Sequence, residues 1–189
     1  GSAQTITKAA GTGYTFSGNS RTNAGTYTVT ATLASGYRWS DNTTGTKTFS
    51  CSIGRSTPVI TLSPTSGTVV AGKTMTFTEK SSVAGKFTNT SGTPSVATVS
   101  PTSNSTAVSA NTNQTVTVTG VASGSSTITV GFTPTDTTNY NSAIAKTYTA
   151  NVSKSATIPT AANYCQSGLI YNGSAQTITK AAGTGYTFS

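Results

Sequence analysis

Short runs in which apolar residues alternate with threonine constrain the fold of this chain more than any other feature. In Thr26–Leu33 every second residue is apolar, and the residues between them are all threonine. Successive side chains of a β-strand point to opposite faces, so Tyr27, Val29 and Ala31 share one face and the threonines the other. The pattern recurs at 74–78, 115–119, 127–130 and 147–152. Each of these runs is predicted to be a half-buried strand.

Turn-forming residues lie between the runs and divide them into many short strands. Such signals, rich in glycine, proline, serine and asparagine, occur at 63–67, 91–94, 122–124 and 172–173. No segment has a helical period over eleven residues. Short strands separated at this spacing are typical of antiparallel sandwiches. The predicted fold class is all-β.

The stretch GSAQTITKAAGTGYTFS occurs twice without a difference, at 1–17 and at 173–189. Gly1 thus corresponds to Gly173, and this offset defines the period of the repeat. An identical internal copy is the signature of repeat architecture. We therefore expect the chain to hold one period of a tandem array and the start of the next period, with both ends of the chain inside one module.

Residues 55–154 resemble the group 2 bacterial immunoglobulin-like domains. The resemblance is carried by PSVATV at 94–99 and by VTVTGVASGSSTITV at 116–130. The second stretch reads as a strand, a Gly-Val-Ala-x-Gly turn and another strand, which is the most recognisable signature of that family. The resemblance implies an immunoglobulin-like β-sandwich, and with the remainder of the chain it implies tandem sandwiches.

The remainder resembles a second bacterial immunoglobulin-like type that is common in long surface proteins. The residues that carry this resemblance are at 169–177, 11–16, 23–31 and 36–39. In this chain the module is divided: residues 155–189 begin the next copy, while residues 1–54 are the C-terminal part of a module. Residues 155–172 joined to residues 1–54 make one complete small module.

This division predicts that residues 1–54 lack an opening strand, which lies around Cys165–Tyr171. A sandwich without that strand exposes an edge and part of its core. A neighbouring copy in the same polypeptide can supply the strand, or separate chains can supply it to one another by strand donation. In either case we expect residues 155–189 to pack against another copy of residues 1–54.

Cys51 and Cys165 lie on the last and first strands of the divided module. These strands can lie close together in such sandwiches, so we expect a disulfide between adjacent copies. The alternative is two buried thiols. Two cysteines in each period without the spacing of a metal site fit an oxidising, extracellular setting.

The composition argues against catalysis and against nucleic-acid binding. The chain has no histidine, and its three carboxylates, Asp41, Glu79 and Asp136, lie in different segments. We therefore expect no enzyme activity, no metal site and no cofactor.

The net charge is +8, but the lysines and arginines are spread singly, whereas nucleic-acid binding needs a concentrated basic stripe. Weak attraction to anionic cell-wall polymers and simple solubility are the two interpretations of the charge that stay open. There is no long apolar run that could span a membrane.

Two small groups of residues carry alternative interpretations. Glu79 beside Lys80 is interpreted as a solvated charge pair, the alternative being the buried acid of a Lys–Asn cross-link. Tyr37 and Trp39 share a face if the segment is extended, which makes them weak candidates for stacking on a sugar. The preferred interpretation is that the single tryptophan anchors the core of its module.

The sequence as a whole favours a structural role, as a spacer repeat in the stalk of a long adhesin or fibre on a bacterial surface. Its expected partners are neighbouring repeats, with cell-wall or host glycans as further candidates. The alternatives are a ligand- or glycan-binding adhesin module, and a self-assembling extracellular filament subunit.

Overall fold

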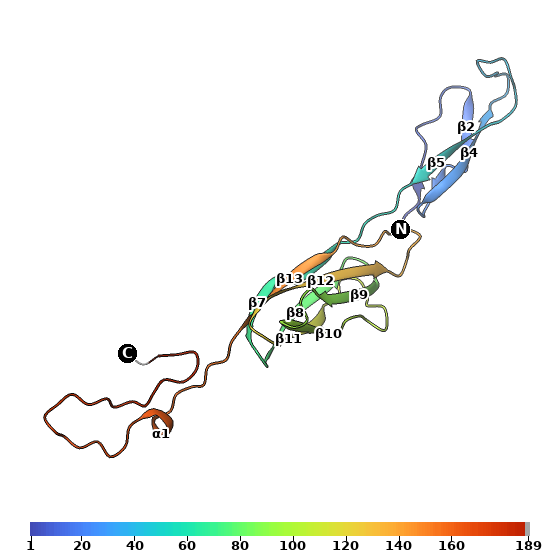
Figure 1. Cartoon of the computed structure of the whole chain (residues 1–189). Helices are drawn as coiled ribbons and strands as arrows, with labels where there is room; N and C mark the ends of the chain where they lie inside the picture. Colours follow the sequence, from blue (N-terminus) through green and yellow to red (C-terminus); the bar gives the residue numbers. More distant parts are fainter. Residues whose placement is uncertain (188–189) are drawn as a thin grey trace.

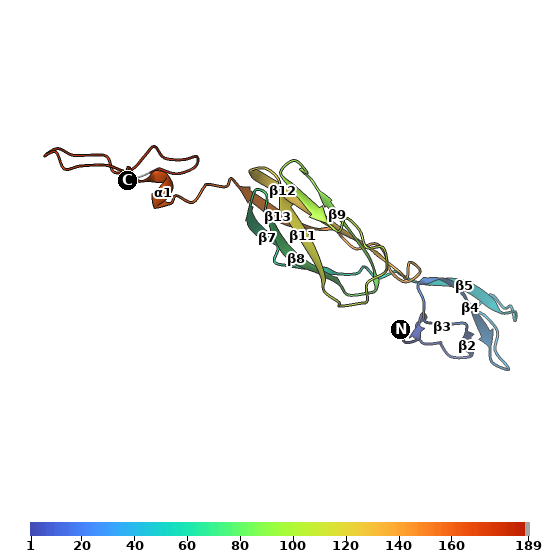
Figure 2. The ribbon, with the colours of Figure 1, turned by 90° about the horizontal axis from the view of Figure 1, so that it is seen from below.

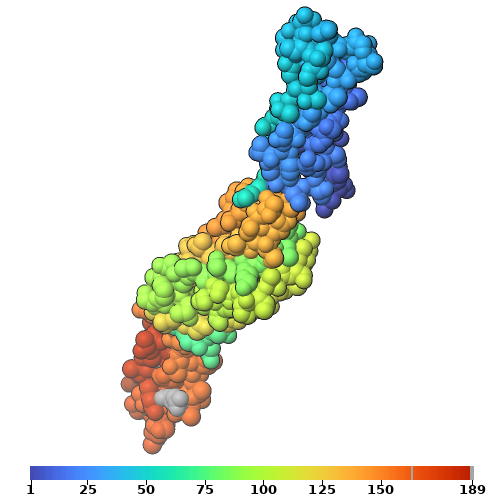
Figure 3. All heavy atoms as spheres, turned by 90° about the vertical axis from the view of Figure 1, so that its right-hand side faces the viewer, coloured from blue at the N-terminus to red at the C-terminus, as the bar shows by residue number. Residues whose placement is uncertain are grey.

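A computed structural model describes residues 1–187, apart from the side chain of Asn163. The described chain has three parts arranged end to end (Figure 1). Residues 1–54, the N-terminal module, and residues 154–187, the C-terminal segment, lie at opposite ends of a central sandwich formed by residues 60–153. The views from below and from the side show the same linear order (Figures 2 and 3).

The N-terminal module consists of two small antiparallel sheets. One sheet pairs β1 with β3, and the other has the order β2-β4-β5. The strands are β1 (Gln4–Thr5), β2 (Tyr14–Ser17), β3 (Ser20–Arg21), β4 (Gly25–Leu33) and β5 (Lys47–Ile53). The alternation in β4 places its apolar residues on one face, opposite Phe16 of β2 and Phe49 of β5. Among the described residues β5 pairs only with β4, so its outer edge has no partner strand.

The central sandwich consists of two four-stranded sheets. Their orders are β10-β11-β8-β6 and β7-β13-β12-β9, and all neighbouring strands are antiparallel except β7 and β13. The strands are β6 (Ile60–Ser63), β7 (Ser66–Val70), β8 (Thr74–Ser81), β9 (Gly85–Ser91), β10 (Ala97–Ser100), β11 (Gln114–Gly120), β12 (Gly124–Pro134) and β13 (Lys146–Ser153). This division of strands between two sheets is that of an immunoglobulin-like sandwich.

The core of the sandwich comes from alternate residues of both sheets. Phe77 of β8 stacks on Tyr148 of β13 across the two sheets, with ring centroids 4.4 Å apart. Both rings are almost completely buried. Every strand of the sandwich contributes a buried apolar residue or one packed against the buried cluster, whereas the N-terminal module as described buries only Val29 and Ala31 to that degree. The central part of the chain therefore has a complete core of its own.

The C-terminal segment has little regular structure. Its one described helix is α1 (Ala161–Tyr164), and no helix among the described residues is long and apolar enough to cross a membrane. Residues 165–171 form no strand. Within 154–187 one β-bridge is present, between Cys165 and Thr179. Leu169, Ile170, Tyr171 and Ile178 are exposed.

The predicted fold class is confirmed, because the chain is all-β and every predicted alternating run lies in a strand. The runs fall in β4, β8, β11, β12 and β13. The predicted turns at 63–67 and 122–124 connect β6 to β7 and β11 to β12. Alternation was a reliable signal here because the inward residues within each predicted run are apolar.

Candidate inter-module junction

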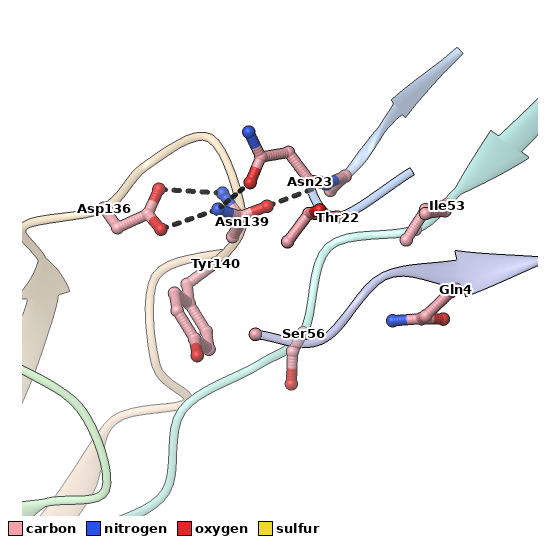
Figure 4. Close-up of a pocket in the computed structure, with 11 residues that line it drawn as sticks. Gln4, Thr22, Asn23, Ile53, Ser56, Asp136, Asn139 and Tyr140 are labelled. Atoms are coloured by element: carbon pink, nitrogen blue, oxygen red, sulfur yellow. Dashed lines mark hydrogen bonds between the residues drawn. The ribbon is translucent and has the colours of Figure 1, made fainter. Parts of the chain in front are cut away.

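The N-terminal module and the central sandwich meet at a set of hydrogen bonds around Asn139 (Figure 4). Asn139 lies in the loop between β12 and β13. Its Oδ1 accepts a hydrogen bond of 2.7 Å from the backbone N–H of Ala24. Its Nδ2 donates to Oδ1 of Asn23 at 3.3 Å and to Oδ2 of Asp136 at 2.7 Å. One amide side chain therefore joins the turn before β4 to the loop of the neighbouring sandwich.

The connecting chain between the modules is held by the same loop. The N–H of Ser56 donates to the backbone oxygen of Asn139 at 2.9 Å, and the N–H of Asn141 donates to the oxygen of Ser56 at 2.8 Å. Ser56 and Tyr140 form a parallel β-bridge. Because these backbone hydrogen bonds fix the connection to the sandwich, it is part of the folded structure and not a free linker.

Asp136 fixes the shape of this loop. Its carboxylate accepts hydrogen bonds from the side chain of Asn139 and from the backbone N–H groups of Thr138 and Asn139. These bonds favour the charged form, so they hold the pKa of Asp136 below its usual value, with the Asn139 side chain as the largest cause. The charged carboxylate in turn orients Asn139 toward residues 23 and 24.

The groups at the junction are suited to a structural contact between the two parts. A cleft between the two parts is lined by polar groups that include Gln4, Thr22, Asn23 and Ser56. The carboxylate that lines it, that of Asp136, is already occupied by hydrogen bonds from the loop. In residues 1–187, His, Cys, Asp and Glu form no group of three or more that could hold a metal ion. The arrangement can orient two modules relative to each other.

Replacing Asn139 by alanine is expected to loosen this junction without unfolding the sandwich. The change removes the hydrogen bonds to Ala24 and Asn23, each contributing about 0.5–1.5 kcal/mol. In ¹⁵N relaxation measurements, residues 1–54 should then tumble faster than the central sandwich. Thr137→Ala is the matched control, since Thr137 is an exposed residue of the same loop. Equal tumbling in Asn139→Ala and the native chain would contradict this role.

Tyr37 and Trp39 lie in an irregular loop at the tip of the N-terminal module, not on a strand. Trp39 packs on Tyr14, with ring centroids 5.5 Å apart, and its Nε1 donates to the backbone oxygen of Gly45. The Tyr37 ring lies against Gly13 and remains 49% exposed. The two rings cover the end of the β2-β4-β5 sheet, and Trp39 is half-buried. The interpretation of Trp39 as the anchor of its module's core stays a prediction. The sugar-stacking interpretation stays a prediction.

Cys51 and Cys165 are free thiols in the described chain and lie in its two end parts. Cys51 is half-buried in β5, and its side chain shares a face with the cross-strand residue Tyr27. Cys165 is exposed, directly after α1. A bond within a single chain is therefore not formed, and the prediction of a bond between copies stays a prediction.

The interpretation of Glu79 and Lys80 as a solvated charge pair is wrong. Glu79 is completely buried between the two sheets, where Asn89 Nδ2 donates to its Oε1 at 3.3 Å. Burial raises the pKa of Glu79 to about 7, and the hydrogen bond from Asn89 only partly opposes this effect. Lys80 lies on the opposite face of β8, so strand alternation keeps it away from Asn89. The geometry does not assemble the predicted alternative, a Lys–Asn cross-link, around this lysine.

Two residues in these sites were missed from the sequence. Asn89 alternates with Phe87 in β9, which indicates an inward position, but a polar residue there was not recognised as buried. Asn139 follows Asp136 by three positions, a spacing typical of turns closed by an aspartate side chain. That spacing indicates a turn, but it carries no information about the module that the turn contacts.

No protein-family model matches this chain, and no curated protein sequence matches it. Among solved structures, it is similar to domains 4 and 5 of the S-layer protein SbsC, with 26% identity over 77% of this chain and 72% of that one and a TM-score of 0.41. A longer SbsC structure, rSbsC(31-844), has 25% identity over 83% of this chain and 22% of that one, with a TM-score of 0.42.

A third similar structure is WR4, an MSP family member of C. elegans, with 14% identity over 50% of this chain and 97% of that one and a TM-score of 0.42. The fold itself rests on the sheets described above. The chain is an all-β protein with a complete immunoglobulin-like sandwich at its centre.

Proposed function

We propose that this chain is one period of a linear array of β-sandwich modules, and that the array is a structural spacer on a bacterial cell surface. In this proposal the central sandwich is a group 2 bacterial immunoglobulin-like domain. Residues 1–54 and 155–172 belong to a second immunoglobulin-like type, as in the stalks of long adhesins. The partners of each period are its neighbouring periods.

One observation carries the proposal: the same stretch, GSAQTITKAAGTGYTFS, stands at both ends of an end-to-end arrangement. Residues 1–17 belong to the part at one end of the central sandwich, and the identical residues begin again at 173 in the part at the other end. A copy added at the repeat offset therefore extends the molecule away from the first copy. The polar junction around Asn139 supports this function, because a spacer requires modules that do not fold back on each other.

The composition is compatible with a role that needs length and solubility. Only 7% of the residues are charged, and threonine covers the outer strand faces. The Asp136 loop joins neighbouring modules by hydrogen bonds within the protein. The spacer role therefore rests on repetition and on the fixed junction.

Small-angle X-ray scattering of polypeptides with one, two and three copies of the period 1–172 tests the proposal. The maximum dimension should rise by an equal step with each added copy, because each copy adds the same rigid length. A polypeptide in which Asn139 is replaced by alanine in every copy should show a smaller step. A compact three-copy polypeptide, with a maximum dimension close to that of one copy, would contradict the spacer function.

A further inference from the structure

The N-terminal module has the strand plan of the central sandwich without the first two strands. Its β1-β3 sheet corresponds to β8-β11, and its β2-β4-β5 sheet corresponds to β9-β12-β13, in the same chain order and with the same antiparallel pairing. The central sandwich adds the edge strand β10 and begins with two further strands, β6 and β7. β6 pairs with β8, and β7 pairs in parallel with β13. The counterparts of β6 and β7 are absent from residues 1–54.

The correspondence extends to individual positions. Gly25 pairs with Ile53 at the start of β4, as Gly124 pairs with Val152 at the start of β12, and the two glycines have φ of 152° and 150°. By the register of these two strand pairs, Phe49 matches Tyr148, and Cys51 matches Ala150. The two parts of the chain therefore share a register and not only an order of strands.

Residues of the N-terminal module are less buried than the residues that match them in the central sandwich, as expected if two covering strands are missing. Tyr148 is 1% exposed, whereas Phe49 is 39% exposed. Ala150 is completely buried, whereas Cys51 is only half-buried. The residues of β5 thus occupy core positions of a sandwich whose first strands are not in place, and the outer edge of β5 is the edge that β7 occupies on β13.

The C-terminal segment contains residues that match the two missing strands, the counterparts of β6 and β7. Residues 164–166 already pair antiparallel with residues 178–180: Gln166 N–H donates to Ile178 O at 2.9 Å, and Lys180 N–H donates to Tyr164 O. By the repeat offset, 178–180 corresponds to 6–8, directly after β1. This pairing therefore matches that of β6 with β8. After a bend at Gly168, the exposed apolar run Leu169–Tyr171 stands where β7 follows β6.

We propose that residues 164–171 are the two opening strands of a sandwich completed by β4 and β5 of a second copy of this chain, with Leu169–Tyr171 pairing in parallel with β5. In the proposed array this is the copy that follows, so the inference rests on the proposed function and names its partner surface. Apolar side chains exposed at 169–171 then cover the half-buried face at Phe49 and Cys51.

The same placement assigns a covalent bond. Cys165 lies on the counterpart of β6 and Cys51 on the counterpart of β13, and β6 contacts β13 in the complete sandwich. Cys51 points into the sandwich, like Ala150. The two thiols form one S–S bond by exchange with a small disulfide oxidant: the two cysteines lose two protons and two electrons, and the oxidant is reduced to two thiols. This bond links adjacent copies through a completed module.

A polypeptide of two copies contains its own control, because only the inner pair of cysteines can meet in a completed module. After oxidation with glutathione disulfide, Cys165 of the first copy and Cys51 of the second should be joined. Cys51 of the first copy and Cys165 of the second should form no bond to a protein cysteine, and should be found as free thiols that react with iodoacetamide or as mixed disulfides with glutathione. Peptide mapping by mass spectrometry without reductant identifies all four.

Ile170→Asp in the first copy should slow formation of the disulfide between the copies at least tenfold. The substitution places a carboxylate in the apolar run that is proposed to pack on β5. Ile144→Asp, at an equally exposed isoleucine on the central sandwich, should leave the rate unchanged. The inference is overturned if all four cysteines react equally, if the bond joins cysteines of one copy, or if Ile170→Asp has no effect. Scattering can still show a linear array in that event, so the spacer function and this inference fail separately.

Discussion

Replacing Glu79 by glutamine is expected to stabilise the central sandwich at pH 8 and to have little effect at pH 4. Within the described residues Glu79 Oε2 and Asn89 Oδ1 are both buried without a hydrogen-bond partner. A neutral carboxylic acid carries an O–H donor, whereas a charged carboxylate leaves Oε2 as a buried acceptor without a donor. A glutamine supplies an N–H donor at every pH.

The sign of the pH dependence follows from the direction of the pKa shift. Burial raises the pKa of Glu79 from 4.5 to about 7, so the folded state keeps a proton that the unfolded state loses. The contribution of Glu79 to the free energy of unfolding is therefore largest below pH 4.5 and falls as the pH rises to 7, by about 3 kcal/mol. Glu79→Gln should remove this fall, which urea unfolding between pH 4 and pH 8 measures.

Asp41→Asn is the matched control for Glu79→Gln. Asp41 is exposed and paired with Lys47 at 2.7 Å, and this contact lowers its pKa, so the group stays charged throughout the pH range of the experiment. Its replacement should leave the slope of stability against pH unchanged. A native chain whose stability is flat from pH 4.5 to 7 would contradict the placement of Glu79 in the core.

Replacing Phe77 by alanine is expected to cost the central sandwich about 3–5 kcal/mol. Phe77 is 1% exposed and stacks on Tyr148, at an interplanar angle of 16°, so its removal leaves a cavity between the sheets. A domain of this size has a free energy of unfolding of about 5–15 kcal/mol, so the loss is a large part of the total. Thermal unfolding followed by near-ultraviolet circular dichroism measures it.

Phe49→Ala provides the comparison for Phe77→Ala. Phe49 is 39% exposed and belongs to the other module, so its removal should leave the melting temperature of the central sandwich unchanged. A loss for Phe77→Ala no larger than that of a typical surface substitution would show that the two rings do not form the centre of the core.

Alternation made most of the central strands predictable from the sequence. Other strands were not recognised because some of their inward residues are not apolar. In β9 the inward residues include Gly85, Phe87 and Asn89, so the buried face does not read as apolar. Glu79 was misinterpreted for the same reason, because charged residues are almost never buried unless they are paired. Its environment depends on β9, which belongs to the opposite sheet and leaves no signal in the residues around Glu79.

The two copies of the repeated stretch show a second reason why local sequence alone does not determine strand formation. Tyr14–Ser17 form β2 because β4 lies beside them, whereas the described part of the second copy has no strand at the matching place. Ile6 donates to Asn19 through its N–H, while its counterpart Ile178 accepts from Gln166 through its carbonyl. Identical residues adopt different pairings because strand formation depends on the partner strand, which lies elsewhere in the chain.

Amide hydrogen exchange on a polypeptide of two copies tests the array most directly. In the first copy the β5 amides that point away from β4 face solvent, and in the second copy they should be covered by residues 169–171 of the first. We predict slow exchange for these amides in the second copy and fast exchange in the first. Equal, fast exchange in both copies would show that no module is completed at the join and would contradict the claim that adjacent periods complete each other's modules.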